Sequence, residues 1–146
     1  MPYRIILGTM MFAVILSQVD HCVAAGAVAI GLPSDVAKSG VSMGYQVNLN
    51  AMDEAKAAAL ARCKTNGSNE SKALCKIVAT FRDQCVAEAI DPEAGTPGFG
   101  WAIADTAQEA QKKAMANCRE TAGPSRQDAC QVDVQGMRTV FDGSAK

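Results

Sequence analysis

The chain has 146 residues, of which 49% are hydrophobic, and 14 basic residues nearly balance 15 acidic ones to give a net charge of −1. Its basic residues form no cluster or stripe, and nucleic acids and anionic membrane surfaces both require a positive footprint. We therefore expect neither of these as a partner.

The first 25 residues have the layout of a removable secretory signal. Arg4 is followed by an apolar run over residues 5–15, and Val23-Ala24-Ala25 ends in small residues suited to signal peptidase. The run is shorter than the roughly 18 residues of a spanning helix. An N-terminal core helix or uncleaved anchor is the alternative. We predict cleavage after Ala25, which removes Cys22 and leaves 26–146 as one domain in the periplasm or outside the cell, with no membrane insertion.

The mature chain contains the same series of predicted elements twice, in copies covering about 26–82 and 83–141. Each copy has an apolar strand, a turn-rich loop, a Gly–aromatic strand, an alanine-rich helix and a strand opened by cysteine. In copy one these are 27–30, 31–40, 44–47, 53–63 and 75–81; in copy two they are 85–90, 91–98, 98–101, 108–118 and 130–135. Strand 75–81 is the more apolar of the last two and is expected to be central in its sheet.

The two helices match without a gap, DEAKAAALARC against QEAQKKAMANC, while the Gly–aromatic strands align with Gly44 opposite Gly98. Thr106 and Glu109 form a capping box, and Asn50 with Asp53 is its expected counterpart. The predicted fold class is α+β: an internally duplicated strand–strand–helix–strand unit, a mainly antiparallel sheet and two equivalent helices. Chance similarity between two alanine-rich helices is the alternative.

The cysteine spacing repeats with the elements. Cys63 and Cys75 are twelve positions apart, as are Cys118 and Cys130. We predict disulfides within each copy, each stabilising by roughly 3 kcal/mol; pairing across the copies is the alternative. Cys85 is left over as an unpaired, buried thiol, or forms an intermolecular disulfide, or is a reactive nucleophile. The spacings are not those of zinc sites, so no metal or other cofactor is expected.

These motifs resemble a known family. EAKAAALARC, CKIVATFRDQC and GFGWAIAD followed by TAQEAQKKAMANC are similar to the bacterial, exported "domain of unknown function 4189" family, over residues 26 to about 137. The resemblance implies an α+β duplication and export, and it supplies no catalytic residues. Family members often carry another cysteine near the end of copy two, where this chain has Val140 and Phe141.

The sequence does not indicate an enzyme. Its one histidine, His21, lies in the predicted signal, so a Ser–His–Asp or Cys–His site is not expected, and no catalytic residue is assigned. Carboxylates remain as an alternative chemistry, that of a small hydrolase. The candidate surface residues are four charged side chains near the copy junction: Arg82, Asp83, Asp91 and Glu93.

We predict a non-enzymatic binding domain, most plausibly for an exported or envelope protein. The loops 31–40 and 91–98 are the expected contact surfaces, because loops on a rigid scaffold often carry binding. Phe99 and Trp101 are possible anchors, although aromatic residues beside glycine in a strand are more often part of the core. A periplasmic inhibitor or immunity protein against an antibacterial effector is the specific alternative, and a passive envelope protein without a ligand is another.

Overall fold

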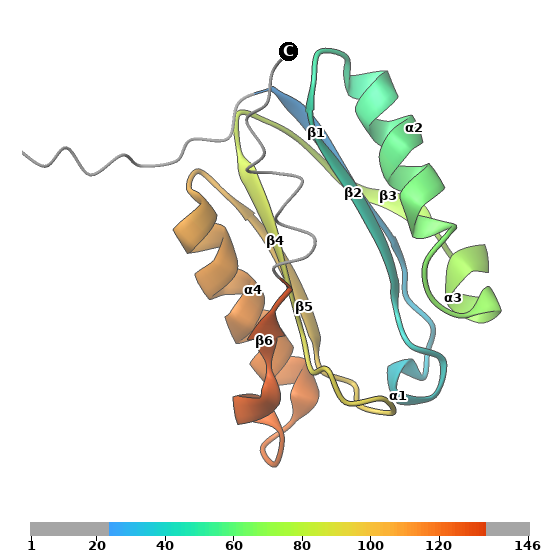
Figure 1. Ribbon diagram of the computed structural model, residues 1–146, viewed down its shortest axis with the longest axis vertical. Coiled ribbons are helices and arrows are strands. Elements are labelled where there is room, and N and C mark those ends of the chain that lie inside the picture. Colours follow the sequence, from blue (N-terminus) through green and yellow to red (C-terminus); the bar gives the residue numbers. More distant parts are fainter. Residues whose placement is uncertain (1–23, 134–146) are drawn as a thin grey trace, which may run out of the picture.

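The computed structural model describes residues 24–133, which form two three-stranded antiparallel sheets and two long helices (Figure 1). The first copy contains β1 Ala25–Gly31, α1 Val36–Ser39, β2 Ser42–Leu49, α2 Met52–Cys63, α3 Asn69–Ala73 and β3 Lys76–Arg82. The second contains β4 Cys85–Ile90, β5 Phe99–Ala104, α4 Ala107–Ala122, the 3-10 turn Gln127–Ala129 and β6 Gln131–Val132.

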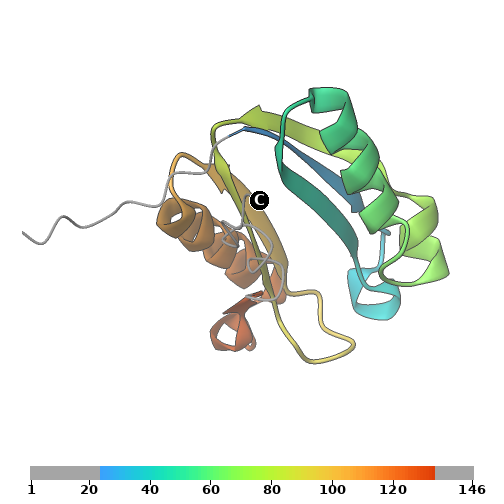
Figure 2. The ribbon, with the colours of Figure 1, turned by 45° about the horizontal axis from the view of Figure 1, so that its top comes forward.

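The two sheets have equivalent strand orders, β2-β1-β3 and β5-β4-β6, so each copy places its first strand in the middle. The helices α2 and α4 cover the outer faces, and the sheets face each other between them (Figures 1 and 2). The predicted α+β fold built from two strand–strand–helix–strand units is confirmed. The small helices α1 and α3 were not predicted.

Small residues join each helix to its sheet. Ala55, Ala59 and Cys63 of α2 pack on Ala27 and Ala29 of β1. Copy two repeats this layer around Ala110, Ala114 and Cys118 of α4. The side chains are small enough to bring helix and sheet backbones close together. At Gly44 an added Cβ would collide with the α2 backbone, and at Gly100 with the α4 backbone.

Larger side chains fill the space between the sheets. This middle layer contains Val28, Ile30, Met43, Tyr45, Val47, Phe81 and Val86, with Phe99, Trp101 and Ile103 at its margin. The molecule therefore has four layers in the order helix, sheet, sheet, helix. Small side chains fill the two interfaces between helix and sheet, and large side chains fill the interface between the sheets. Burial of the central side chains provides the main hydrophobic attraction between the two copies.

Three details of the sequence prediction are wrong. Strand β3 is at the edge of its sheet, because β1 is buried at every position and takes the centre with small residues that both faces can cover. Gly44 corresponds to Gly100 rather than Gly98, since these two contact equivalent helix atoms. Helix α2 begins after Ala51 without a side-chain cap, so Asn50 does not cap it.

The Thr106 half of the predicted capping box is present: its side chain accepts a hydrogen bond from the Glu109 backbone NH at 3.3 Å. The predicted disulfides Cys63–Cys75 and Cys118–Cys130 are both confirmed. Each bond joins the last turns of a long helix to the residue just before the following strand. The four cysteines thus close two matching segments of chain.

Cys85 is also disulfide-bonded, so the prediction of an unpaired thiol is wrong. That prediction depended on losing Cys22 with the signal. The other four described cysteines bond to one another, so the partner of Cys85 lies outside the described residues. The predicted signal also lies outside them, apart from Ala24 and Ala25. Ala25 is fully buried as the first residue of β1, so cleavage after it would shorten that strand.

Candidate functional site

The four predicted surface residues do not form one surface. Arg82 and Asp83 lie before β4, whereas Asp91 and Glu93 follow it, so the two pairs are at opposite ends of that strand. Arg82 is exposed at the end of β3. Asp83 has a left-handed backbone (φ 56°) and exchanges two hydrogen bonds with Ala24: its carboxylate accepts from the Ala24 NH at 2.9 Å, and its own NH donates to the Ala24 carbonyl at 3.1 Å. Asp83 therefore fixes the residue that precedes β1.

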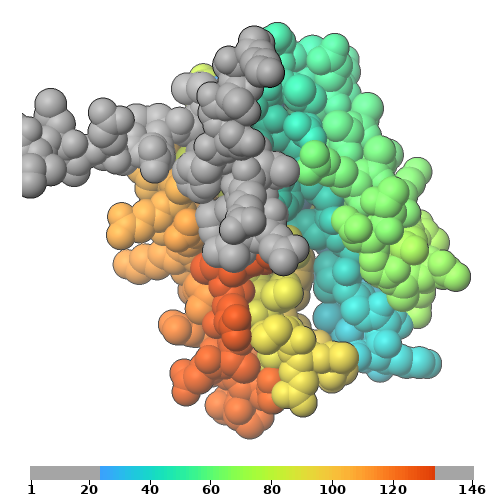
Figure 3. Space-filling model, in the orientation of Figure 1, coloured from blue at the N-terminus to red at the C-terminus, as the bar shows by residue number. Residues whose placement is uncertain are grey.

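The two loops predicted as contact surfaces do lie together. Residues 36–41, including α1, and residues 91–96 form the walls of a cleft of about 500 Å³ at one end of the molecule, which we call the end cleft. Figure 3 shows these segments, cyan and yellow, next to each other on the surface. Glu88, Ile90 and Phe99 also line the cleft.

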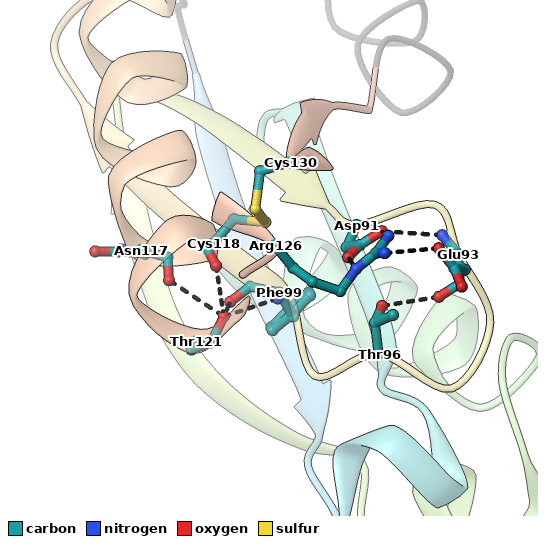
Figure 4. The surroundings of a disulfide bond; sticks show 9 residues. All are labelled: Asp91, Glu93, Thr96, Phe99, Asn117, Cys118, Thr121, Arg126 and Cys130. Carbon is teal, nitrogen blue, oxygen red and sulfur yellow. Dashed lines mark hydrogen bonds and ion pairs between the residues drawn. A yellow bond between two sulfur atoms is a disulfide. The ribbon is translucent and has the colours of Figure 1, made fainter. Parts of the chain in front are cut away.

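Arg126 holds the second wall in place (Figure 4). Its guanidinium donates to Asp91 through Nε at 2.5 Å and through a terminal nitrogen at 2.9 Å, and it pairs with Glu93 at 2.7 Å. The hydrogen bonds and charge of Arg126 lower the pKa of Asp91 to about 2, and the Glu93 NH donates to the same carboxylate. Asp91 is thus a fixed anion that shapes the loop.

Both walls are attached to segments that the disulfides close. Arg126 lies between Cys118 and Cys130, and it reaches back to the loop between β4 and β5. In copy one, Glu70 of α3 lies between Cys63 and Cys75 and accepts a hydrogen bond from Ser39 of α1 at 2.6 Å. The disulfides therefore position the loops of the cleft as well as the strands.

Glu88 is a functional candidate that the sequence reasoning missed. It is directly opposite Trp101 in the β4–β5 pairing, and Val86 two residues earlier lies in the layer between the sheets, so Glu88 faces the same way. Burial, followed by the negative charge of Asp133, raises the pKa of Glu88 to about 7. Burial and the charges of Glu88 and Asp133 also raise the pKa of Tyr45 on β2. A charged residue inside the apolar strand CVAEAI was the signal for this site.

A second depression lies between the edge strands β3 and β5. We call it the apolar groove; it has a volume of about 370 Å³, and its lining residues are Ile30, Leu32, Leu74, Lys76, Val78, Phe99 and Trp101. The three large hydrophobic residues that are most exposed in the described part of the chain all lie here: Leu32 at 58%, Leu74 at 46% and Val78 at 40%. Phe99 and Trp101, the possible anchors, are partly buried against the middle layer and also form part of the groove wall.

A local irregularity turns Val78 toward this groove. In the β1–β3 pairing, Val28 is opposite Ala79 and the next residue, Ala29, is opposite Ile77, so Val78 is the extra residue of a bulge. A bulge reorients a side chain and interrupts the hydrogen bonding of an edge strand. The groove thus presents side chains rather than a regular open strand edge.

Within residues 24–133, no three His, Cys, Asp or Glu side chains are grouped so that they could hold a metal ion. The helices described in this range include none that is both long and apolar enough to cross a membrane.

Comparison with known protein families shows where the chain belongs. The profile of the domain of unknown function 4189 family matches residues 25–135, which span both copies and both disulfides. No curated protein and no solved structure matches the chain significantly. The chain thus belongs to the family named domain of unknown function 4189.

Proposed function

We propose that this protein is an exported, non-enzymatic binding domain that uses the apolar groove to hold a segment of a partner protein. The observation that carries the proposal is the gathering of Leu32, Leu74 and Val78 around Trp101 and Phe99. Exposed apolar residues scattered singly need no explanation, but a contiguous group beside aromatic residues is typical of interaction sites.

The groove is also held in position before any partner arrives. Leu74 immediately precedes Cys75, whose bond to Cys63 fixes it to the end of α2. On the opposite wall, Asn117 of α4 donates to the Trp101 carbonyl at 2.8 Å, and the Thr121 hydroxyl bonds to both the NH and the carbonyl of Phe99 (Figure 4). A preorganised surface loses less conformational entropy on binding.

The lining indicates the chemistry of the occupant. Six of the seven lining residues are apolar, and the seventh is Lys76. We expect a partner segment that inserts one or two apolar side chains and carries a carboxylate next to them to pair with Lys76. An inhibitor or immunity protein that binds an antibacterial effector would be one instance of this function.

Export is supported by the cysteine chemistry. All five cysteines of the described residues are in disulfides, which persist in oxidising compartments and are rare in the cytosol.

A hydrolase based on the predicted carboxylates is disfavoured, because Arg126 keeps Asp91 ionised and is also paired with Glu93. A carboxylate with a pKa of about 2 is a poor proton donor near neutral pH.

The test places a charge inside the groove. Leu74→Glu and Val78→Glu should each abolish saturable capture of a partner by the purified protein from cell-envelope extract, because they introduce a carboxylate into an apolar contact. Thr80→Glu is the matched control: it adds the same charge to an exposed position of β3 outside the groove. The recovered partner should then bind the wild-type protein in isolation by calorimetry.

Equal capture by wild type, Leu74→Glu and Val78→Glu would overturn the proposal, as would the absence of any saturable partner. A loss of capture with Thr80→Glu as large as with Val78→Glu would also contradict it, since it would show a general charge effect. Unchanged near-ultraviolet circular dichroism in all three variants confirms that the fold is retained.

A further inference from the structure

The end cleft contains a carboxyl group that the fold does not require. The pairing of β4 with β5 places Glu88 opposite Trp101, and that of β1 with β2 places Val28 opposite Tyr45, so Glu88 stands where copy one has Val28. Val28 is fully buried in the layer between the sheets. Because an aliphatic residue satisfies this position in one copy, the carboxyl group in the other needs a reason beyond packing.

Glu88 has no compensating charge among the described residues. No hydrogen bond or ion pair joins its carboxyl group to a described residue, and the charge that acts on it, from Asp133, is negative. Arg126, which holds the loop 91–96 in place, is already paired with Asp91 and Glu93. Lys38 on α1 is exposed, and of the basic residues in the range 24–133 it alone lines the cleft. Tyr45 on β2 is close enough for the charge of Glu88 to raise the pKa of its phenol.

The remaining lining suits a long aliphatic stem. Val36 and Ala37 of α1 contribute apolar surface on one wall, and Ile90 and Phe99 contribute it near Glu88. A volume of about 500 Å³ lies within the usual range for small-ligand sites. A side chain with several methylene groups and a terminal charge can cover such walls with its stem while its head reaches the carboxyl group.

We propose that the end cleft binds an aliphatic cation, such as the side chain of lysine or arginine in a peptide, with Glu88 as its counter-ion. This site is separate from the apolar groove of the proposed function, although Phe99 lines both. The proposal therefore stands or falls independently of whether the groove binds a protein.

Binding of a cation here has a signature that general surface attraction lacks. Because the pKa of Glu88 is raised to about 7, part of the protein carries a protonated Glu88 near neutral pH, and an arriving cation should displace that proton. Titration calorimetry in two buffers with different ionisation enthalpies should measure a net release of protons on binding, which decreases as the pH is raised.

The probes are Nα-acetyl-lysine amide and Nα-acetyl-arginine amide, with Nα-acetyl-norleucine amide as the uncharged control of similar length. We expect either cation to bind saturably and the norleucine compound to bind at least tenfold more weakly. Glu88→Gln should weaken cation binding about tenfold and remove the proton release, because the amide cannot ionise. Glu88→Val, which restores the copy-one residue, should have the same effect in a folded protein.

Two further variants separate this site from its surroundings. Glu54→Gln removes an exposed carboxylate of α2 that does not line the cleft and should leave cation binding within twofold of wild type. Lys38→Met should strengthen binding, because it removes a competing positive charge. Equal binding of the lysine and norleucine compounds, no saturable binding of either cation, or unchanged proton release in Glu88→Gln would each overturn the proposal.

Discussion

At the scale of single residues, two carboxyl groups that line the same cleft have opposite environments. Asp91 accepts two hydrogen bonds from Arg126 and one from the backbone, which favour its charged form. Glu88 is partly buried beside another negative charge, which favours its neutral form. The sequence prediction identified Asp91, which was near a turn, but missed Glu88, because charge clustering along the chain does not reveal which face of a strand a residue occupies.

The raised pKa of Glu88 predicts how stability depends on pH. The folded protein binds the Glu88 proton more tightly than the unfolded chain, so its contribution is complete below about pH 4.5 and is lost as the pH rises through 7. The wild type should lose up to about 3 kcal/mol between pH 4.5 and 8 relative to Glu88→Gln. Urea unfolding at several pH values measures this difference, and parallel pH profiles for the two proteins would contradict it.

Asp91 changes the pH dependence of stability in the opposite direction and over a different pH range. Its lowered pKa means that its contribution is present above about pH 4 and is lost as the pH falls toward 2. Between pH 5 and 8 Asp91 remains ionised in both states. The comparison of wild type with Glu88→Gln in that range therefore isolates Glu88, while Tyr45 stays protonated because its pKa is raised.

At the scale of secondary-structure elements, the sequence predicted the helices and the disulfides well because both depend on local spacing. The position of each strand within its sheet was harder to predict. The apolar residues of β3 suggested a central strand, yet the alanine- and glycine-rich β1 is central because a helix and a sheet both cover it closely. Similarly, aligning one Gly–aromatic pair by its letters matched Gly44 with Gly98, whereas contact with the helix matches Gly44 with Gly100.

The equivalence of Gly44 and Gly100 can be tested by adding one methyl group at each position. Gly44→Ala and Gly100→Ala should each destabilise the protein by about 1–3 kcal/mol, because the Cβ would press on helix backbone that cannot move aside easily. Gly123→Ala is the control: its φ of 76° carries a backbone cost, but nothing lies within 4 Å of the added atom. Denaturant midpoints give the comparison. If Gly44→Ala and Gly100→Ala cost no more than Gly123→Ala, the close helix–sheet contact is wrong.

At the scale of the whole molecule, a duplicated unit provides the scaffold, and the sites lie where the two copies differ or meet. The copies share strand order, helix placement and disulfide spacing. The apolar groove lies between the edge strands of the two sheets, and the end cleft lies between one loop from each copy. The sequence could predict the repeated parts from their repetition. It also predicted the two loops of the end cleft as contact surfaces, but it predicted neither their meeting nor the apolar groove, because both depend on how one copy packs against the other.

The disulfide map tests the twin-unit architecture most directly. Non-reducing proteolysis of the natively oxidised protein, followed by mass spectrometry, should recover Cys63 joined to Cys75, Cys118 joined to Cys130, and Cys85 joined to a further fragment that identifies its partner. A bond from Cys63 or Cys75 to Cys118 or Cys130, or a reduced Cys85 in the oxidised protein, would contradict the account.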